Sequence, residues 1–270
     1  MNKKNALLII DAQNDFCHPD GTLFVPGAND DMERLAQWLK ENKEKIDYIG
    51  VTLDSHQVID ISHPAFWADK DGNFPPPFTG ISVEDVENGI WTPKFYPKEA
   101  YEYLVSLKEQ GEFPHTIWPE HCLIGSWGTA LYEPIIEAIT EWCRLGRSFV
   151  PVAKGTHPTT EHFGAFRAQV PVEGRKETQL NEPLIKVLEE YQNVFFAGEA
   201  KSHCVANTLK QALEYAPNLA QKFVILEDCM SNVPTFERIA DNIYAEAKNR
   251  SIRFSTVDQQ KLVTSTAAAV

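Results

Sequence analysis

The sequence lacks the features of a membrane protein or a nucleic-acid-binding protein. No apolar stretch approaches the length of a transmembrane helix, and the N-terminal apolar run is too short for a signal peptide. Basic residues are few, because 25 Lys and Arg stand against 38 Asp and Glu, for a net charge of −13. This acidity argues against binding to nucleic acid or to an anionic membrane surface. We therefore expect neither nucleic acid nor membrane as a partner.

Cysteine patterns that would indicate disulfides or a zinc site are also missing. The five cysteines are an odd number, and none of them forms a CxxC pair. This usage is typical of reduced thiols, so a cytoplasmic location is expected. No internal repeat and no linker divides the 270 residues. The length suits one large α/β domain or two small ones, and the unbroken pattern favours one domain.

Short apolar runs alternate with amphipathic segments, which predicts a doubly wound parallel sheet with helices on both faces. Strands are predicted over residues 6–10, 48–53, 148–153 (broken by Pro151), 194–197, 223–226 and 253–257. Helices are predicted over residues 30–42, 98–109, 131–144, 180–191, 205–213 and 234–248. The expected domain covers residues 1–264, with an insertion at about 69–114 and a frayed tail at 265–270. The insertion is either a lid or binding wall, or a solvated loop without a role.

The stretch from Asn193 to Thr208 contains the candidate nucleophile. Cys204 follows a predicted strand, and a helix begins directly after it. Free N–H groups and the dipole at a helix N-terminus stabilise an anion, so a lowered pKa of the thiol is expected there. The alternative is that Cys204 is a small buried apolar residue, as free cysteines usually are.

Polar residues end three other predicted strands, at Asp11, at Asp54 with His56, and at Lys154. Parallel strands end on the same edge of a sheet, so these side chains are expected to meet Cys204 there. A carboxylate can take the thiol proton, and an ammonium group favours the thiolate. Together they predict a Cys–Asp–Lys site for acyl transfer. The alternatives are a loop cap for Asp11 and a solvated side chain for Lys154.

Asp54 and His56 are two residues apart and therefore point the same way from an extended backbone. His121 could supply a third ligand and His63 a fourth. One carboxylate with two imidazoles suits a divalent metal ion, with Zn²⁺ expected and Fe²⁺ or Mn²⁺ as alternatives.

Five motifs follow one another in an order that resembles a known family. They are IIDAQNDF (9–16), LDSH (53–56), WPEHCLIGSWG (118–128), KG followed by FGAF (154–166) and GEAKSHCV (198–205). The set resembles the nicotinamidase/pyrazinamidase branch of the isochorismatase-like cysteine hydrolases. The resemblance implies that Cys204 is the nucleophile, Asp11 the general base and acid, and Lys154 the third member of the triad. It also implies that Asp54, His56 and His121 hold a metal, which binds the pyridine nitrogen of the substrate.

The same resemblance implies how the substrate is held. Phe16 and Trp118 match the residues that sandwich the ring. A cis peptide is expected at Glu199–Ala200, with the N–H groups of Ala200 and Cys204 as the oxyanion hole. Family members often self-associate, so a homo-oligomer is expected. The chain departs from the family at Glu199, usually apolar and here expected to bring a charge near the pocket, and in its longer connection between the second and third motifs.

The predicted function is therefore metal-dependent hydrolysis of a small-molecule amide, with nicotinamide converted to nicotinate and ammonia, a step of NAD salvage. One alternative is another amidase of the superfamily that acts on a carbamoyl or ureido compound without using the metal site. A second alternative is a non-catalytic, flavodoxin-like binding protein that retains the pocket.

Overall fold

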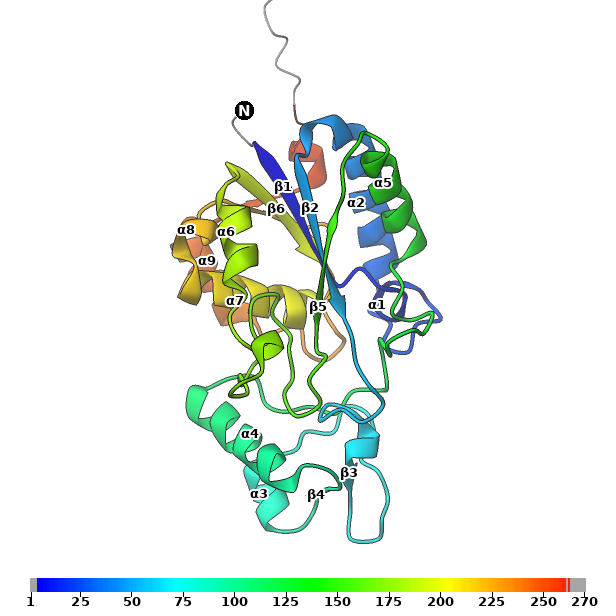
Figure 1. Cartoon of the computed structure of the whole chain (residues 1–270), viewed down its shortest axis with the longest axis vertical. Coiled ribbons are helices and arrows are strands. Elements are labelled where there is room, and N and C mark those ends of the chain that lie inside the picture. Colours follow the sequence, from blue (N-terminus) through cyan, green and yellow to red (C-terminus); the bar gives the residue numbers. More distant parts are fainter. Residues whose placement is uncertain (1–3, 261, 263–270) are drawn as a thin grey trace, which may run out of the picture.

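The computed structural model, which describes residues 4–260 and residue 262, contains a six-stranded parallel sheet (Figure 1). Its strands are β1 (Asn5–Ile10), β2 (Tyr48–Asp54), β5 (Val150–Lys154), β6 (Asn193–Gly198), β7 (Phe223–Leu226) and β8 (Arg253–Ser255). Their order in space is β5-β2-β1-β6-β7-β8, and all neighbouring pairs are parallel. This arrangement confirms the predicted doubly wound α/β fold.

Strand β1 lies in the middle of the sheet and is buried on both faces. Leu7 and Ile9 belong to one hydrophobic cluster, whereas Ala6, Leu8 and Ile10 belong to another. The residues alternate because successive side chains of a strand point to opposite faces of the sheet. A run of apolar residues without alternation with polar ones is therefore what this position requires.

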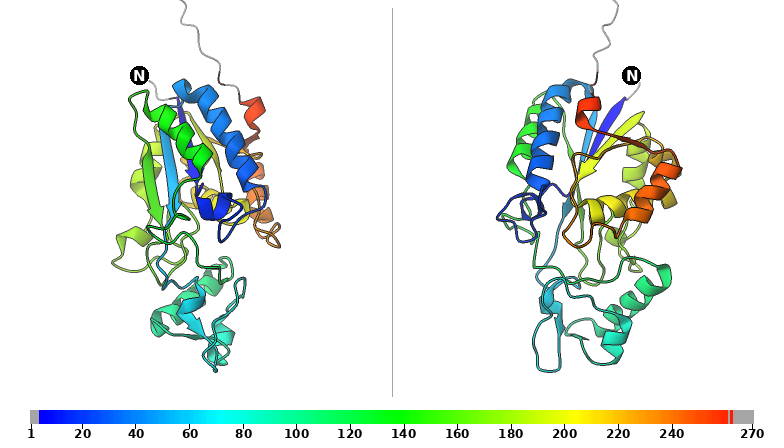
Figure 2. Two further views of the ribbon diagram at one scale, coloured as in Figure 1. Left: turned by 90° about the vertical axis from the view of Figure 1, so that its right-hand side faces the viewer. Right: turned by 180° about the vertical axis from the view of Figure 1, so that it is seen from behind.

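Helices cover both faces of the sheet (Figures 1 and 2). The first face is covered by α2 (Ala28–Asn42) and α5 (Glu133–Cys143). The second face is covered by α6 (Glu182–Glu189), α7 (Ala206–Tyr215), α8 (Pro217–Ala220) and α9 (Asp241–Asn249). The strand order reverses between β1 and β6, so the loops after these strands diverge at the edge of the sheet where α/β proteins place ligands.

The connection between β2 and α5 projects beyond the carboxyl ends of the strands and has its own small core (Figures 1 and 2). It contains α3 (Val83–Glu87), α4 (Pro97–Gln110) and the antiparallel pair β3 (Trp67–Ala68) and β4 (Thr92–Pro93). The apolar cluster runs from Ile61 to Ile117 and therefore extends past the 69–114 bounds expected from the sequence.

Two predicted elements differ from the structure. Pro151 does not break its strand, because β5 is an edge strand, where the N–H that proline lacks need not be paired. The helix predicted from residue 234 begins only at Asp241, since residues 231–240 form turns and Thr235 has a φ of 71°. This irregular segment packs over the candidate site.

Three other predictions concern membrane spans, the cysteines and the last residues of the chain. No helix among residues 4–260 is long and apolar enough to cross a membrane. All five cysteines lie within the described residues and are free. The predicted fraying of residues 265–270 lies outside the described residues.

Candidate active site

Lys154 contacts the other two predicted members of the triad. It ends β5, and its Nζ lies 2.8 Å from Asp11 Oδ2 and 3.5 Å from Cys204 Sγ. The same Nζ lies 3.0 Å from Asp54 Oδ1. The lysine side chain is 1% exposed, so these contacts are shielded from water. The four residues come from the ends of β1, β2, β5 and β6, as expected for one edge of a parallel sheet.

Asp11 is held in place by its neighbour in the sheet, Thr52. The Thr52 hydroxyl accepts a hydrogen bond from the Asp11 N–H (3.0 Å) and donates one to Asp11 Oδ1 (2.6 Å). Asp11 has a φ of 45°, a left-handed conformation that is uncommon outside glycine. Strained backbone of this kind is often found at functional sites, where the surrounding structure compensates its cost.

The pKa of the Cys204 thiol differs from the lowered pKa that was expected from the sequence. Burial raises the pKa of the Cys204 thiol well above its ordinary value; Lys154 lowers it in part, and Asp11 raises it further. Burial also raises the pKa of Asp11, against the opposing effect of Lys154. For Lys154, burial is outweighed by Asp11 and Asp54, so its pKa is raised well above its ordinary value and the ammonium is kept. Cys204 is therefore a thiol beside a carboxyl group, and attack by sulfur requires transfer of its proton.

Cys204 lies in a π-helical turn between β6 and α7. Gly198 ends β6 with a φ of 129°, and a Cβ there would lie 2.1 Å from the Ile10 carbonyl oxygen. The Glu199–Ala200 peptide is cis, as the resemblance implies. Residues Lys201–Val205 then form a π-helical turn that leads into α7, so Cys204 precedes the regular helix instead of opening it.

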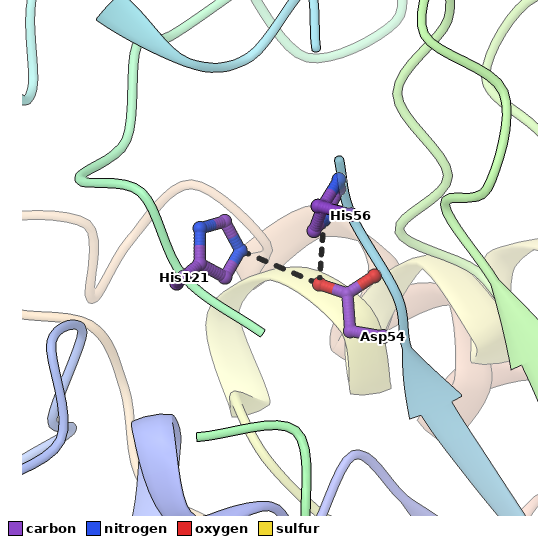
Figure 3. A group of neighbouring side chains, drawn as sticks. All are labelled: Asp54, His56 and His121. Carbon is purple, nitrogen blue, oxygen red and sulfur yellow. Dashed lines mark ion pairs between the residues drawn. The ribbon is translucent and has the colours of Figure 1, made fainter. Parts of the chain in front are cut away.

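Asp54, His56 and His121 form a group whose candidate ligand atoms all lie within 4.8 Å of one another (Figure 3). Asp54 Oδ2 lies 3.1 Å from His56 Nε2 and 3.4 Å from His121 Nε2. Burial would raise the pKa of Asp54, but His56 and Lys154 lower it well below its ordinary value. The carboxylate therefore stays ionised, which is the form that binds a cation.

The orientation of both imidazoles fits a divalent cation. His56 Nδ1 faces Asp60 Oδ2 at 3.0 Å, and His121 Nδ1 faces the Pro119 carbonyl oxygen at 2.8 Å. Each Nδ1 can donate its proton to oxygen, which leaves each Nε2 free to bind a metal. The His56 Nε2 is buried and has no hydrogen-bond partner. An oxygen and two nitrogens turned toward one point suit Zn²⁺ or a similar ion.

His63, the predicted fourth ligand, is next to this group but not a member of it. Its Nε2 lies 3.3 Å from His121 Nδ1, and its Nδ1 lies 3.1 Å from the Gln57 carbonyl oxygen. Burial, together with His121 and His56, lowers the pKa of His63 to about 3. His63 is thus a neutral neighbour that packs against His121, a candidate metal ligand.

Gly155 is needed beside the candidate metal group, because a Cβ there would lie 2.8 Å from Asp54 Oδ1.

A pocket is lined by Cys204 of the predicted triad and by Asp54 and His121 of the candidate metal group. Phe16 and Trp118, the predicted ring-binding residues, line it together with Cys204, Ala200 and His121. The other lining residues are Leu23, Asp54, Glu161, Phe163, His203 and Val233. The pocket thus has aromatic walls beside the thiol and the candidate metal ligands.

Sequence reasoning missed several of these residues. Leu23 and Val233 lie on loops without periodicity, so no pattern could place them in the pocket. Asp60, which faces His56, follows it by four residues outside any regular element. The 69–114 connection supplies none of the residues found to line the pocket, although Phe78 packs edge-on against Trp118 at 5.9 Å.

The expected charge of Glu199 near the pocket is not found there. Its side chain is fully buried and is not part of the pocket lining. Burial and the nearby Asp31 raise the pKa of Glu199 well above its ordinary value. The residue therefore lies outside the pocket lining, where burial disfavours a negative charge on it.

Comparison with known proteins gives relatives of one kind. No family model matches the chain. The nicotinamidase of Saccharomyces cerevisiae is 23% identical over 249 residues, which cover 91% of this chain and 96% of that protein. The structure of the yeast nicotinamidase bound to nicotinaldehyde aligns with a TM-score of 0.65 at 21% identity, over 93% of this chain and 99% of that one.

Two further solved structures have the same fold. The nicotinamidase/pyrazinamidase of Acinetobacter baumannii aligns with a TM-score of 0.64 at 19% identity, over 95% of this chain and 98% of that one. The pyrazinamidase of Pyrococcus horikoshii in complex with zinc aligns with a TM-score of 0.53 at 21% identity, over 94% and 99%. The chain is therefore similar in sequence to the yeast nicotinamidase and has the fold of these nicotinamidase and pyrazinamidase structures.

Proposed function

We propose that this protein is a metal-dependent cysteine amidohydrolase that converts nicotinamide to nicotinate and ammonia. The observation that carries the proposal is the position of Lys154, whose Nζ contacts Asp11, Cys204 and Asp54 at one end of an aromatic pocket. Cys204, Asp54 and His121 line that pocket, and Lys154 links Cys204 to Asp11. The relation to nicotinamidases in sequence and fold supports the choice of substrate.

In the proposed reaction Asp11 takes the proton of Cys204, and the sulfur attacks the amide carbonyl carbon. The N–H groups of Ala200 and Cys204 hold the developing oxyanion, an effect worth roughly 3 kcal/mol for each donor. Asp11 then gives its proton to the departing ammonia. Asp11 then deprotonates a water molecule, which attacks the thioester carbon; the C–S bond breaks, nicotinate is released, and Asp11 returns the proton to the sulfur of Cys204. Lys154 keeps the charges of this buried site balanced throughout.

Asp54, His56 and His121 would hold the divalent ion, with Zn²⁺ proposed. When bound, such an ion supplies a Lewis acid that can accept the lone pair of the pyridine nitrogen. Phe16 and Trp118 would contact the faces of the ring. The free thiols of the chain fit the reducing cytoplasm expected from the sequence.

The direct test is ammonia release from a small panel of amides. Nicotinamide and pyrazinamide are expected to react, and benzamide serves as the matched control, since it has the same amide on a ring without nitrogen. We expect kcat/KM for nicotinamide to exceed that for benzamide by about 10²-fold or more, because a site built for a polar atom rejects the analogue without it. Release of ammonia only from a ureido or carbamoyl compound would contradict the proposal.

Metal removal is expected to lower nicotinamide hydrolysis by at least about tenfold, with recovery when the ion is returned. Elemental analysis of the purified protein should find one divalent ion per chain, and Asp54→Ala should reduce that content. His18→Ala is the matched control, because His18 is partly exposed and lies outside the Asp54–His56–His121 group. Full activity in protein shown by elemental analysis to be free of metal would support the metal-independent alternative instead.

A further inference from the structure

Glu199 is a buried carboxyl group that the proposed reaction does not use. It is 0% exposed and immediately precedes Ala200. Its Oε2 accepts a hydrogen bond from the Ser231 N–H at 3.1 Å, and its Oε1 has no hydrogen-bond partner. A buried polar side chain that satisfies only part of its hydrogen-bonding capacity destabilises the fold, so its presence calls for an explanation.

Glu199 lies in the contact between two segments, residues 198–202 before the thiol and residues 229–233 after β7. Four hydrogen bonds join them, from the N–H of Gly198 to the Cys229 carbonyl (3.1 Å), of Lys201 to the Ser231 carbonyl (2.8 Å), of Ser231 to Glu199 Oε2 (3.1 Å) and of Val233 to Ser202 Oγ (3.0 Å). Two of the four use a side chain as acceptor. The contact therefore depends on the identity of residues 199 and 202.

The second segment forms part of the pocket wall. Val233 lines the pocket beside Ala200 and Cys204. Three residues on, Phe236 packs against Trp118 at 5.6 Å and against His203 at 5.1 Å between ring centroids. The position of residues 229–233 thus decides how closely this wall approaches a bound ring.

Asp31 on α2 borders the same contact. Its Oδ2 accepts a hydrogen bond from the Ser231 hydroxyl at 2.5 Å, and its Oδ1 pairs with Arg34 at 3.0 Å. Because burial and Asp31 disfavour a second negative charge, the pKa of Glu199 is raised, which favours the protonated form of its carboxyl group. A protonated carboxyl group has nearly the shape and hydrogen-bonding pattern of a primary amide. Glutamine should therefore replace it, whereas an apolar side chain should not.

We propose that Glu199 is a positioning residue: its carboxyl group fixes residues 229–233 against the turn that carries Ala200 and Cys204, and so sets the pocket wall that meets the substrate ring. The inference rests on the proposed function. Glu199 acts through Ser231 and Val233 and does not touch the substrate.

The test compares Glu199→Gln with Glu199→Met. Methionine fills a similar volume but cannot accept the hydrogen bond, so KM for nicotinamide should rise about tenfold, which corresponds to one unsatisfied buried N–H. The kcat value should change by less than about threefold, because the wall binds the ring and takes no part in the chemistry. Glu199→Gln should keep both values close to those of the original protein. Glu227→Met is the matched control on the exposed side of the same loop.

A second measurement separates this inference from the proposed function. Hydrogen exchange of the Ser231 and Val233 amides should be faster in Glu199→Met and unchanged in Glu199→Gln, and neither result requires a substrate. An unchanged KM and unchanged exchange in Glu199→Met would overturn the inference, as would a glutamine variant that is equally impaired. If the methionine variant does not fold, Glu199→Asp replaces it, because the shorter acid cannot reach Ser231. Absence of nicotinamide hydrolysis in the original protein would refute the proposed function alone.

Discussion

Replacement of Cys204 by alanine is expected to lower kcat for nicotinamide hydrolysis by at least about 10³-fold, the order of loss seen when a covalent nucleophile is removed. The physical reason is that the thioester cannot form without sulfur, and no other nucleophile replaces it. Cys204 is buried beside Lys154 and lines the pocket, so its sulfur is placed to meet the carbonyl carbon of a bound amide. Steady-state ammonia release measures the loss.

Cys143→Ala is the matched control for this substitution. Cys143 is also a free cysteine, but it lies partly exposed on α5, outside the pocket. Activity of this variant should equal that of the original protein. Mass spectrometry of the original protein quenched with acid during turnover should reveal an acyl adduct on the peptide that contains Cys204. More than a tenth of the activity remaining in Cys204→Ala would contradict the nucleophile assignment.

Lys154→Met is expected to abolish activity and to destabilise the fold by about 3–5 kcal/mol, the cost of removing one partner from a buried ion pair. Lys154 is the cation that lies between the Asp11 and Asp54 carboxyl groups, and methionine keeps the length of the side chain without its charge. Asp11 and Asp54 would then face each other without the cation that separates them. Chemical denaturation, with metal present and with metal removed, gives the free energy of unfolding.

The loss of folding stability in Lys154→Met is expected to depend on pH in one direction. In the folded protein, burial raises the pKa of Asp54, but His56 and Lys154 outweigh it, so that pKa is lowered. The stabilisation that a lowered pKa provides is present above the ordinary pKa of aspartate and is lost as the pH falls. The difference between Lys154→Met and the original protein should therefore be largest near neutral pH and should shrink only as the pH falls below about 4.

Lys210→Met provides the control for Lys154→Met. Lys210 pairs with Glu112 at 2.8 Å, but its side chain is 22% exposed. An ion pair that water can reach is worth about 0–1 kcal/mol, so this variant should lose little stability and no activity. Equal stability losses in the two lysine variants would show that the contacts of Lys154 with the two acids stabilise the fold no more than the Lys210–Glu112 ion pair does.

Much of the fold could be predicted because the local pattern of apolar and polar residues indicates which segments are buried. The apolar runs that end at Asp11 and Asp54 are buried strands, whereas the run that ends at Lys154 is an edge strand in which Lys154 alone is buried. Parallel strands end on one edge of the sheet, so the three polar residues meet there. Local pattern failed where a long-range contact decides the structure. Pro151 is tolerated only because its strand lies at the edge of the sheet, and residues 231–240 are irregular because they pack over the pocket.

The sequence by itself predicted which residues carry the proposed chemistry, and it determined that Asp11, Asp54, Lys154 and Cys204 follow strands of one sheet. Only the tertiary structure decided their protonation, since the pKa of a thiol or carboxyl group depends on burial and on charges that come from distant parts of the chain. It also decided that Glu199 turns away from the pocket, toward Asp31 and Ser231. The sequence shows which ionisable groups are present. Their charge depends on exclusion from water, and this exclusion arises only when the segments of the chain have packed together.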